Sequence, residues 1–265
     1  MKPFIIDMHA HLGNAGTFYM PDTAPERMLK LADKCGIEKF IASHNVGILT
    51  HELEFAHEES RKIVEKFAGR IYAYCIYDPN LPDLSLKILT GYSAHPGFPG
   101  IKAHAALHEY PINGKNYNPL WEFAEKNKKP VLIHTWDDTP RNVYPFELVD
   151  VQRNATPKLV AEVASRHPGL VLILGHAGGH FNGNIQAVEA VRKHRNVFLD
   201  ICGEATRFGI VDWLVEQAGA EKVMYASDMN WLDPRCHIAR VIGSKLGDKD
   251  VYMLLKGNAE RIFKF

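Results

Sequence analysis

Short apolar runs that alternate with helix-like segments constrain the fold of this 265-residue chain more than any other feature. Eight such runs recur at intervals of roughly 25 to 40 residues, and each is followed by a segment with helical spacing of its apolar residues. The predicted strands are residues 3–11, 39–43, 71–76, 100–104, 130–134, 170–176, 196–201 and 222–228. The predicted helices are residues 24–35, 52–67, 84–92, 119–127, 157–166, 184–193, 210–218, 236–246 and 250–262.

Eight strand–helix units with no linker between them predict one domain, residues 1–265, folded as a (β/α)₈ TIM barrel. Several runs, such as residues 170–176, are apolar at nearly every position, which is typical of a parallel sheet covered on both faces. We expect a slightly distorted barrel with extra C-terminal helices. An open doubly wound sheet is the alternative, but no Gly-x-Gly-x-x-Gly follows the first strand, which weakens it.

Charge and cysteine content narrow the classes of partner. The chain has 31 basic and 31 acidic residues and no basic run, which favours a small-molecule substrate over nucleic acid or a membrane surface. No apolar run reaches ~18 residues, and the first residues lack the apolar core of a signal peptide. The four cysteines form no Cys-x-x-Cys pair, and Cys75 and Cys202 lie in apolar runs that predict buried thiols. We therefore expect a soluble cytoplasmic protein with reduced cysteines. The sequence does not decide between a monomer and a homo-oligomer.

The first predicted strand ends in the sequence Asp-Met-His-Ala-His. In an extended strand alternate side chains share a face, so Asp7, His9 and His11 are expected on one face and the residues between them on the other. Two imidazoles at this spacing can reach one divalent ion, and a carboxylate two residues earlier can join or orient them. The alternative is a pair of histidines without a ligand role, because an isolated His-x-His is weak evidence.

Polar residues end nearly every predicted strand, and several of the 14 histidines are among them. Barrel enzymes place their chemistry at these C-terminal strand ends, which meet at one mouth of the barrel. The residues at these ends are His9, His11, His44, Asp78, Lys102, His104, His134, His176, Asp200 and Asp228. Each of His134 and His176 alone is more typical of a hydrogen-bonded core residue. Together with His9, His11 and Asp228, however, they supply the ligands that suit zinc, manganese or iron(II).

These strand ends carry motifs that resemble the amidohydrolase superfamily, in particular its amidohydrolase-related branch. That branch contains metal-dependent hydrolases and non-oxidative decarboxylases of the aminocarboxymuconate-semialdehyde decarboxylase type. The matching segments are residues 7–11 (DMHAH), 100–104 (GIKAH), 131–135 (VLIHT), 174–179 (LGHAGG), 225–228 (YASD) and 257–263 (GNAERIF). They run from the first strand to the last helix, so the resemblance covers the whole chain.

The resemblance implies that His9, His11, His134 and Asp228 bind one divalent metal ion, with zinc expected first and manganese or iron as alternatives. It also implies a water molecule in the open position of the ion, which lowers the pKa of that water toward ~7. Asp228 would accept the proton of this water, and His176 would act as the acid/base residue above it. With two ions, His134 and His176 would bind the second.

Lys102, Arg141 and Arg207 are the candidate substrate-binding residues. Lys102 stands near the position at which binuclear relatives carry a carboxylated lysine that bridges two ions. We favour the unmodified amine, because the branch that this chain resembles is usually mononuclear. Arg141 lies in the long loop after the fifth strand and Arg207 follows the seventh, where either could hold a substrate carboxylate in a bidentate pair. For either arginine alone, a surface salt bridge is the simpler interpretation.

Other histidines fall on predicted helices or at helix ends, away from the strand ends that would build the site. They are His51, His57, His95, His167 and His194. We expect these five to be solvated surface residues without a part in the chemistry.

Together these features predict a metal-dependent hydrolase of a small, carboxylate-bearing amide, lactone or ester. Metal-bound water would attack the carbonyl carbon, Asp228 would take the proton, and His176 would assist its return. The first alternative is a decarboxylase of an aromatic or unsaturated acid, because the same ligand set serves both reactions. The second alternative is a non-catalytic barrel that binds a metal or a small ligand, which an open ligand set of this kind disfavours.

Overall fold

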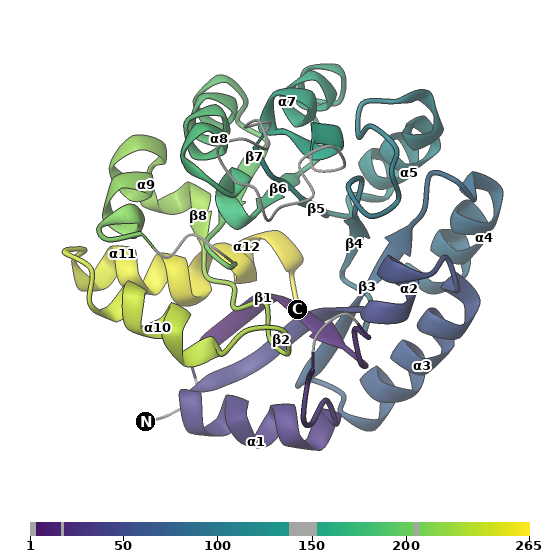
Figure 1. Cartoon of the computed structure of the whole chain (residues 1–265), viewed down its shortest axis with the longest axis horizontal. Coiled ribbons are helices and arrows are strands. Elements are labelled where there is room, and N and C mark those ends of the chain that lie inside the picture. The colour runs from purple at the N-terminus through teal and green to yellow at the C-terminus, as the bar shows by residue number, and fades with distance from the viewer. Residues whose placement is uncertain (1–3, 17–18, 138–152, 204–206) are drawn as a thin grey trace.

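Eight parallel strands follow one another in chain order around a nearly closed ring, with helices outside it (Figure 1). The computed structural model describes residues 4–16, 19–137, 153–203 and 207–265. The strands are β1 (Ile5–Leu12), β2 (Ile37–His44), β3 (Ile71–Tyr77), β4 (Gly100–Ala103), β5 (Val131–His134), β6 (Leu172–Gly175), β7 (Val197–Asp200) and β8 (Val223–Met224). Every neighbouring pair from β1 to β8 is parallel, so the predicted (β/α)₈ TIM barrel is confirmed.

The helices form the outer layer and begin where the sequence offers a helix start. They are α1 (Pro25–Cys35), α2 (Asn45–Leu49), α3 (Leu53–Lys66), α4 (Pro82–Tyr92), α5 (Asn118–Asn127), α7 (Pro157–Arg166), α8 (Phe181–Lys193), α9 (Ile210–Ala218), α10 (Pro234–Ile242), α11 (Asp248–Tyr252) and α12 (Asn258–Phe263). Proline in the first turn of α1, α4, α5, α7 and α10 fixes φ where its missing N–H is not needed. The extra C-terminal helices are present as α10 to α12, and the short α2 was not predicted.

The apolar core has an inner part within the barrel and an outer part between strands and helices. Ile6, Met8 and Phe198 belong to the inner part, which also includes Ala259 and Phe263 of α12. The last helix therefore closes one end of the barrel, and the C-terminus lies over the middle of the ring in Figure 1. Among the described residues, no helix combines the length and apolarity needed to cross a membrane.

The ring closes between β8 and β1 through a short and irregular contact. β8 is limited to Val223–Met224, whereas the sequence predicted a strand over residues 222–228. Beyond it, the N–H of Asp228 donates to the carbonyl of His9 (2.8 Å), and Ala10 pairs with Met229. Asp228 has a left-handed backbone (φ 62°), which is uncommon for a residue other than glycine. The predicted distortion of the barrel therefore lies beside two of the predicted metal ligands.

A β-bulge in β1 changes which side chains face the barrel interior. The pairing of β1 with β2 takes up one additional residue of β1 between Asp7 and Ala10. An extra residue of this kind breaks the strict alternation of side chains. Met8 packs in the inner core, and His9 reaches the barrel mouth beside it. The prediction that Asp7 accompanies His9 is wrong, because the Asp7 carboxylate instead accepts hydrogen bonds from the backbone N–H (3.0 Å) and hydroxyl of Ser227.

His57 is a buried link between α3 and β3, and the expectation of a solvated side chain is wrong for it. The residue is 1% exposed. Its Nδ1 donates to the carbonyl of Leu53 (2.6 Å), and its Nε2 accepts from the N–H of Ile76 (2.9 Å). Burial lowers the pKa of His57 to about 4. The other four histidines of that group are exposed (His51) or partly exposed (His95, His167, His194).

Candidate metal centre

His9 lies at the centre of a group of polar side chains at the C-terminal ends of the strands. Its Nδ1 donates to Oδ2 of Asp200 (2.9 Å), the last residue of β7. Because a carboxylate can only accept this proton, the bond leaves the lone pair of His9 on Nε2. That Nε2 lies 2.7 Å from Nζ of Lys102 and 3.5 Å from Oδ1 of Asp228. His9 thus directs a free ring nitrogen toward a buried cation and a buried carboxylate.

His11 converges on the same carboxylate oxygen as His9. Its Nε2 lies 2.9 Å from Oδ1 of Asp228, and the Trp231 ring stacks on it at 4.8 Å between centroids. Two imidazole nitrogens and a carboxylate oxygen at such separations match three ligands of a tetrahedral ion with bonds of about 2.0 to 2.2 Å. The donor set of His9, His11 and Asp228 therefore fits a divalent metal ion.

Lys102 places a positive charge at this point of the barrel. Its side chain is fully buried, and burial lowers the pKa of the amine to about 8, against the opposing charges of Asp228 and Asp200. The amine thus keeps a proton at neutral pH and is held by the free nitrogen of His9. A buried ammonium between an imidazole and two carboxylates stands in for a metal cation, which is a second indication that the site fits one.

His176 and His134 belong to the same cluster. The ring of His176 lies 5.2 Å from that of His9 and 4.5 Å from that of His134, between centroids. His134 also stacks on His104 at 4.1 Å. The backbone N–H of His176 donates to Oδ1 of Asp200 (2.8 Å), so one carboxylate holds both the ring of His9 and the backbone of His176. The structure thus brings all the predicted metal and catalytic residues to one place.

The cluster contains groups in three different charge states at neutral pH. Burial lowers the pKa of His176 to about 4, so this ring is neutral. Burial alone would raise the pKa of Asp228, but the hydrogen bond from His11 and the nearby imidazoles hold it well below its usual range. With the protonated amine of Lys102, the cluster offers a neutral base, a carboxylate and an acid.

Asp200 and Cys202 also belong to this cluster, although the sequence predicted only a strand-end position for Asp200 and a buried thiol for Cys202. Sγ of Cys202 lies 3.1 Å from Nδ1 of His9 and 3.4 Å from Nδ1 of His176. Ligand atoms of Cys202, His9, His176 and Asp228 all lie within 4.8 Å of one another. Nδ1 of His9 donates to Asp200, so the thiol of Cys202 lies on the side of the His9 ring that is opposite Nε2. The i, i+2 spacing at the end of the seventh predicted strand was the available signal for both residues.

The three predicted substrate-binding residues have different outcomes. Lys102 is part of the cluster, whereas Arg141 lies outside the described residues. Arg207 donates to the carbonyl of Gly179 (3.3 Å) and to Oδ1 of Asn184, near the start of α8. Its guanidinium therefore stabilises the loop that follows β6, which begins at His176 of the cluster.

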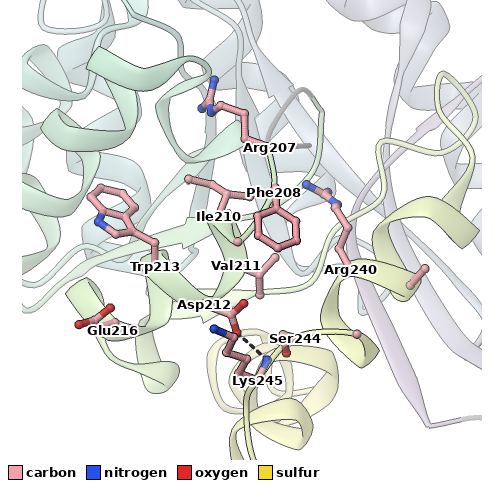
Figure 2. Close-up of a pocket in the computed structure, with 13 residues that line it drawn as sticks. Arg207, Phe208, Ile210, Val211, Asp212, Trp213, Glu216, Arg240, Ser244 and Lys245 are labelled. Carbon is pink, nitrogen blue, oxygen red and sulfur yellow. Dashed lines mark hydrogen bonds between the residues drawn. The ribbon is translucent and has the colours of Figure 1, made fainter.

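Arg207 also borders a surface cleft of about 520 Å³ along α9 and α10. Figure 2 shows Arg207 at one end of this cleft, with its guanidinium directed away from Phe208 and Trp213. At the other end, Asp212 accepts a hydrogen bond from the backbone N–H of Lys245 (2.7 Å). None of the clustered histidines and aspartates lines this cleft. Side-chain chemistry, rather than cavity size, therefore locates the candidate site at the barrel mouth.

A sequence model of the family described as Amidohydrolase matches residues 6–265. This chain belongs to the amidohydrolase family. The resemblance seen in the strand-end motifs is thereby confirmed, and the match places the chain in a superfamily of enzymes. No curated protein matches the sequence.

Solved structures of aromatic-acid decarboxylases share the fold of this amidohydrolase. The 2,6-dihydroxybenzoate decarboxylase from Rhizobium is 18% identical, with a TM-score of 0.79 over 100% of this chain and 99% of that one. The 5-carboxyvanillate decarboxylase from Sphingomonas paucimobilis is 15% identical, with a TM-score of 0.76 over 100% of both chains. The dihydroxybenzoic acid decarboxylase from Polaromonas sp. JS666, with bound manganese and 2-nitroresorcinol, is 17% identical (TM-score 0.79, 100% and 97%). At these identities the likeness establishes the fold.

Proposed function

We propose that this amidohydrolase-family protein is a metal-dependent decarboxylase of a small aromatic or unsaturated carboxylic acid. The observation that carries the proposal is the convergence of His9 and His11 on Asp228, beside the buried ammonium of Lys102. The full-length likeness to aromatic-acid decarboxylases supports the choice of reaction. This order reverses the sequence-based expectation, in which hydrolysis came first.

The chain would hold one divalent ion through His9, His11, His134 and Asp228. The manganese bound in one decarboxylase of the same fold supports manganese as this ion, and zinc stays the ion expected from the sequence. When bound, the ion would supply a Lewis acid that neutralises negative charge on the substrate. Asp200 serves this arrangement by keeping Nε2 of His9 free of a proton.

Decarboxylation breaks the bond between the substrate carbon and its carboxylate, leaves the electron pair on that carbon and replaces carbon dioxide by one proton. Lys102 is suited to hold the substrate carboxylate, because it carries a buried positive charge at neutral pH. The same amine can deliver the proton, since a donor with a pKa of about 8 is mostly protonated near pH 7. Neutral His176 and ionised Asp228 act as hydrogen-bond acceptors that orient the acid, and a proton from solvent restores the ammonium of Lys102 after each turnover.

Hydrolysis of a carboxylate-bearing amide, lactone or ester is the second candidate. It is favoured by the two proton acceptors, because hydrolysis needs a base next to the attacking water. Asp228 would take the proton of that water, and His176 would pass it to the leaving group. In this case Lys102 would bind the carboxylate of the substrate without giving up its proton.

Isotope labelling separates the two reactions. Dihydroxybenzoates with a ¹³C-labelled carboxylate, and a panel of carboxylated lactones and amides, are incubated with the manganese- or zinc-loaded protein in ¹⁸O water. A decarboxylase releases labelled carbon dioxide, and Asp228→Asn abolishes the release. Incorporation of ¹⁸O into a product without carbon dioxide would assign the hydrolase. Ligand binding that survives metal removal, with no turnover of any substrate, would leave a non-catalytic barrel.

A further inference from the structure

A second group of ligand-type side chains lies at the barrel mouth on the side of β3 and β4, which are neighbours in the ring (Figure 1). It consists of His51, between α2 and α3, Asp78, which follows β3, and His108, in the loop after β4. We refer to these three residues as the His51 cluster. One ligand atom from each residue lies within 4.8 Å of the others. None of the three takes part in the proposed reaction.

Asp78 provides a buried carboxylate between the two imidazoles. Its Oδ2 accepts a hydrogen bond from Nδ1 of His51, and its Oδ1 accepts from the N–H of Asn80 (2.9 Å). Nδ1 of His108 lies 3.9 Å from Oδ1, which is too long for a hydrogen bond. Two atoms bound to one zinc-type ion, at about 2.0 to 2.2 Å each, lie ~3 to 4 Å apart. The gap between Asp78 and His108 thus has the size that a bridging ion spans.

His108 is the member of the cluster whose polar atoms lack a hydrogen bond. Its side chain is buried (2% exposed), and neither ring nitrogen makes a hydrogen bond within the described part of the chain. Burial lowers the pKa of His108, and the Asp78 carboxylate and the backbone of Gly47 and Ile48 oppose this shift. The ring nitrogens therefore have backbone carbonyls and Asp78 nearby but no hydrogen bond of good geometry, which leaves them available to a ligand.

His51 leaves the cluster open to solvent. Its side chain is about half exposed (52%), while the side chain of Asp78 is fully buried. The His51 backbone is left-handed (φ 60°), a conformation that few residues other than glycine adopt. This conformation places the imidazole against Asp78, with its ring 5.8 Å from that of His108.

We propose that His51, Asp78 and His108 form a second metal site, which binds a divalent transition-metal ion such as Zn²⁺. Two imidazoles and one carboxylate are the ligand types of zinc, and the nitrogen donors disfavour magnesium and calcium. The exposed edge at His51 leaves a coordination position for water or for an external ligand. The site is separate from the residues around His9 and does not depend on the reaction proposed for them.

Metal stoichiometry tests the site without any substrate. The metal-free protein is equilibrated by dialysis against low free Zn²⁺, and bound zinc is measured by elemental analysis. Wild type is expected to bind two ions, one at each site. His51→Asn should bind one, and asparagine is chosen because it tolerates the left-handed backbone of this exposed position. Asp228→Asn should also lose one ion, and the double variant should bind none.

A matched variant controls for the loss of a histidine as such. His95→Asn removes a partly exposed imidazole outside both sites and should keep two ions. His108→Gln, at the buried end of the cluster, should lose the same ion as His51→Asn. Circular dichroism of the metal-free variants shows that each is folded. Equal zinc content in wild type, His51→Asn and His108→Gln would overturn the proposal, whatever the activity of the protein.

Discussion

The ammonium of Lys102 and Nε2 of His9 lie 2.7 Å apart in the barrel mouth. The nitrogen that the proposed metal site needs is therefore engaged by a positive charge. A divalent ion and this ammonium compete for one lone pair and repel each other. In the proposed function, binding of the ion would require Lys102 to turn away from His9 and would free its charge for the carboxylate of the substrate.

Replacement of Lys102 should therefore change metal and substrate binding in opposite directions. In Lys102→Met the competing cation is gone, so we expect the affinity for zinc or manganese to rise about tenfold or more. The same variant should raise the KM for a carboxylated substrate about 30- to 160-fold, because a charged hydrogen bond contributes roughly 2 to 3 kcal/mol, and it should lower kcat because the proposed proton donor is removed. Chelator competition measures the first effect, and steady-state kinetics measures the second.

Lys129→Met is the control, because Lys129 is a half-buried lysine that donates to the carbonyl of Phe98 instead of to His9. It should change neither quantity. A loss of metal in Lys102→Met would contradict the competition and would indicate a carboxylated lysine that binds the ion.

Asp200 should control metal affinity through the tautomer of His9. In Asp200→Asn the side-chain amide can donate to Nδ1, which moves the ring proton to Nε2 and blocks the nitrogen that faces Asp228. Loss of such a partner typically lowers metal affinity about 10- to 100-fold. Cys202→Ala separates this effect from direct ligation by the neighbouring thiol. Metal retained in Cys202→Ala and weakened in Asp200→Asn agrees with the geometry, whereas equal loss in both would make Cys202 a ligand.

Gly203 holds space for the ring of His176. Its backbone is left-handed (φ 67°), and a Cβ atom at this position would collide with Nδ1 of His176. Gly203→Ala should displace the imidazole and lower kcat about 100-fold, as misplacement of a catalytic group by ~1 Å can. Metal content should stay unchanged if His176 is not a ligand.

Gly209→Ala is the matched control for the backbone penalty. Gly209 is also left-handed (φ 74°), but a Cβ atom there would meet nothing within 4 Å. This variant should lose some stability and keep its activity. Equal activity losses in the two variants would exclude a specific effect on His176.

The barrel and its mouth could be predicted because both follow from periodic patterns. Eight apolar runs with helices between them leave few other folds, and parallel strands bring all their C-terminal ends to one face. This rule alone predicts that four residues from distant parts of the sequence lie close together, namely His9, His134, His176 and Asp228. This rule could not predict the bulge in β1, because a bulge depends on how β1 pairs with β2 and not on the pattern within one strand.

The partners within the site could not be predicted in the same way. Asp200 and His9 are 191 residues apart, and only the positions of their side chains show that they form a hydrogen bond. The same applies to Cys202, whose apolar surroundings in the sequence predicted a buried thiol but not its contact with His9. The prediction that His57 is solvated was wrong because the helical pattern of α3 does not show that the His57 ring packs against β3 and accepts a hydrogen bond from Ile76.

His57 should make folding stability depend on pH. An unfolded chain binds a proton at this imidazole near its usual pKa of 6.5, whereas the folded protein does so only near pH 4, because burial lowers the pKa. Between these values the unfolded state binds more protons, so the contribution of His57 is complete above pH 6.5 and is lost as the pH falls toward 4. Over about 1.5 pH units, from about 6.5 to about 5, the loss is roughly 2 kcal/mol.

Urea unfolding of wild type and His57→Gln at about pH 7.5 and about pH 5 checks this difference. The variant should be less stable than wild type at the higher pH, because the hydrogen bonds to Leu53 and Ile76 are weakened. On acidification it should lose less free energy of unfolding than wild type, by roughly 2 kcal/mol. Other buried histidines titrate equally in both proteins, so the difference isolates His57. Parallel losses in the two proteins would mean that the imidazole is protonated with equal ease in the folded and unfolded chains, and that the bridge from α3 to β3 does not require its neutral form.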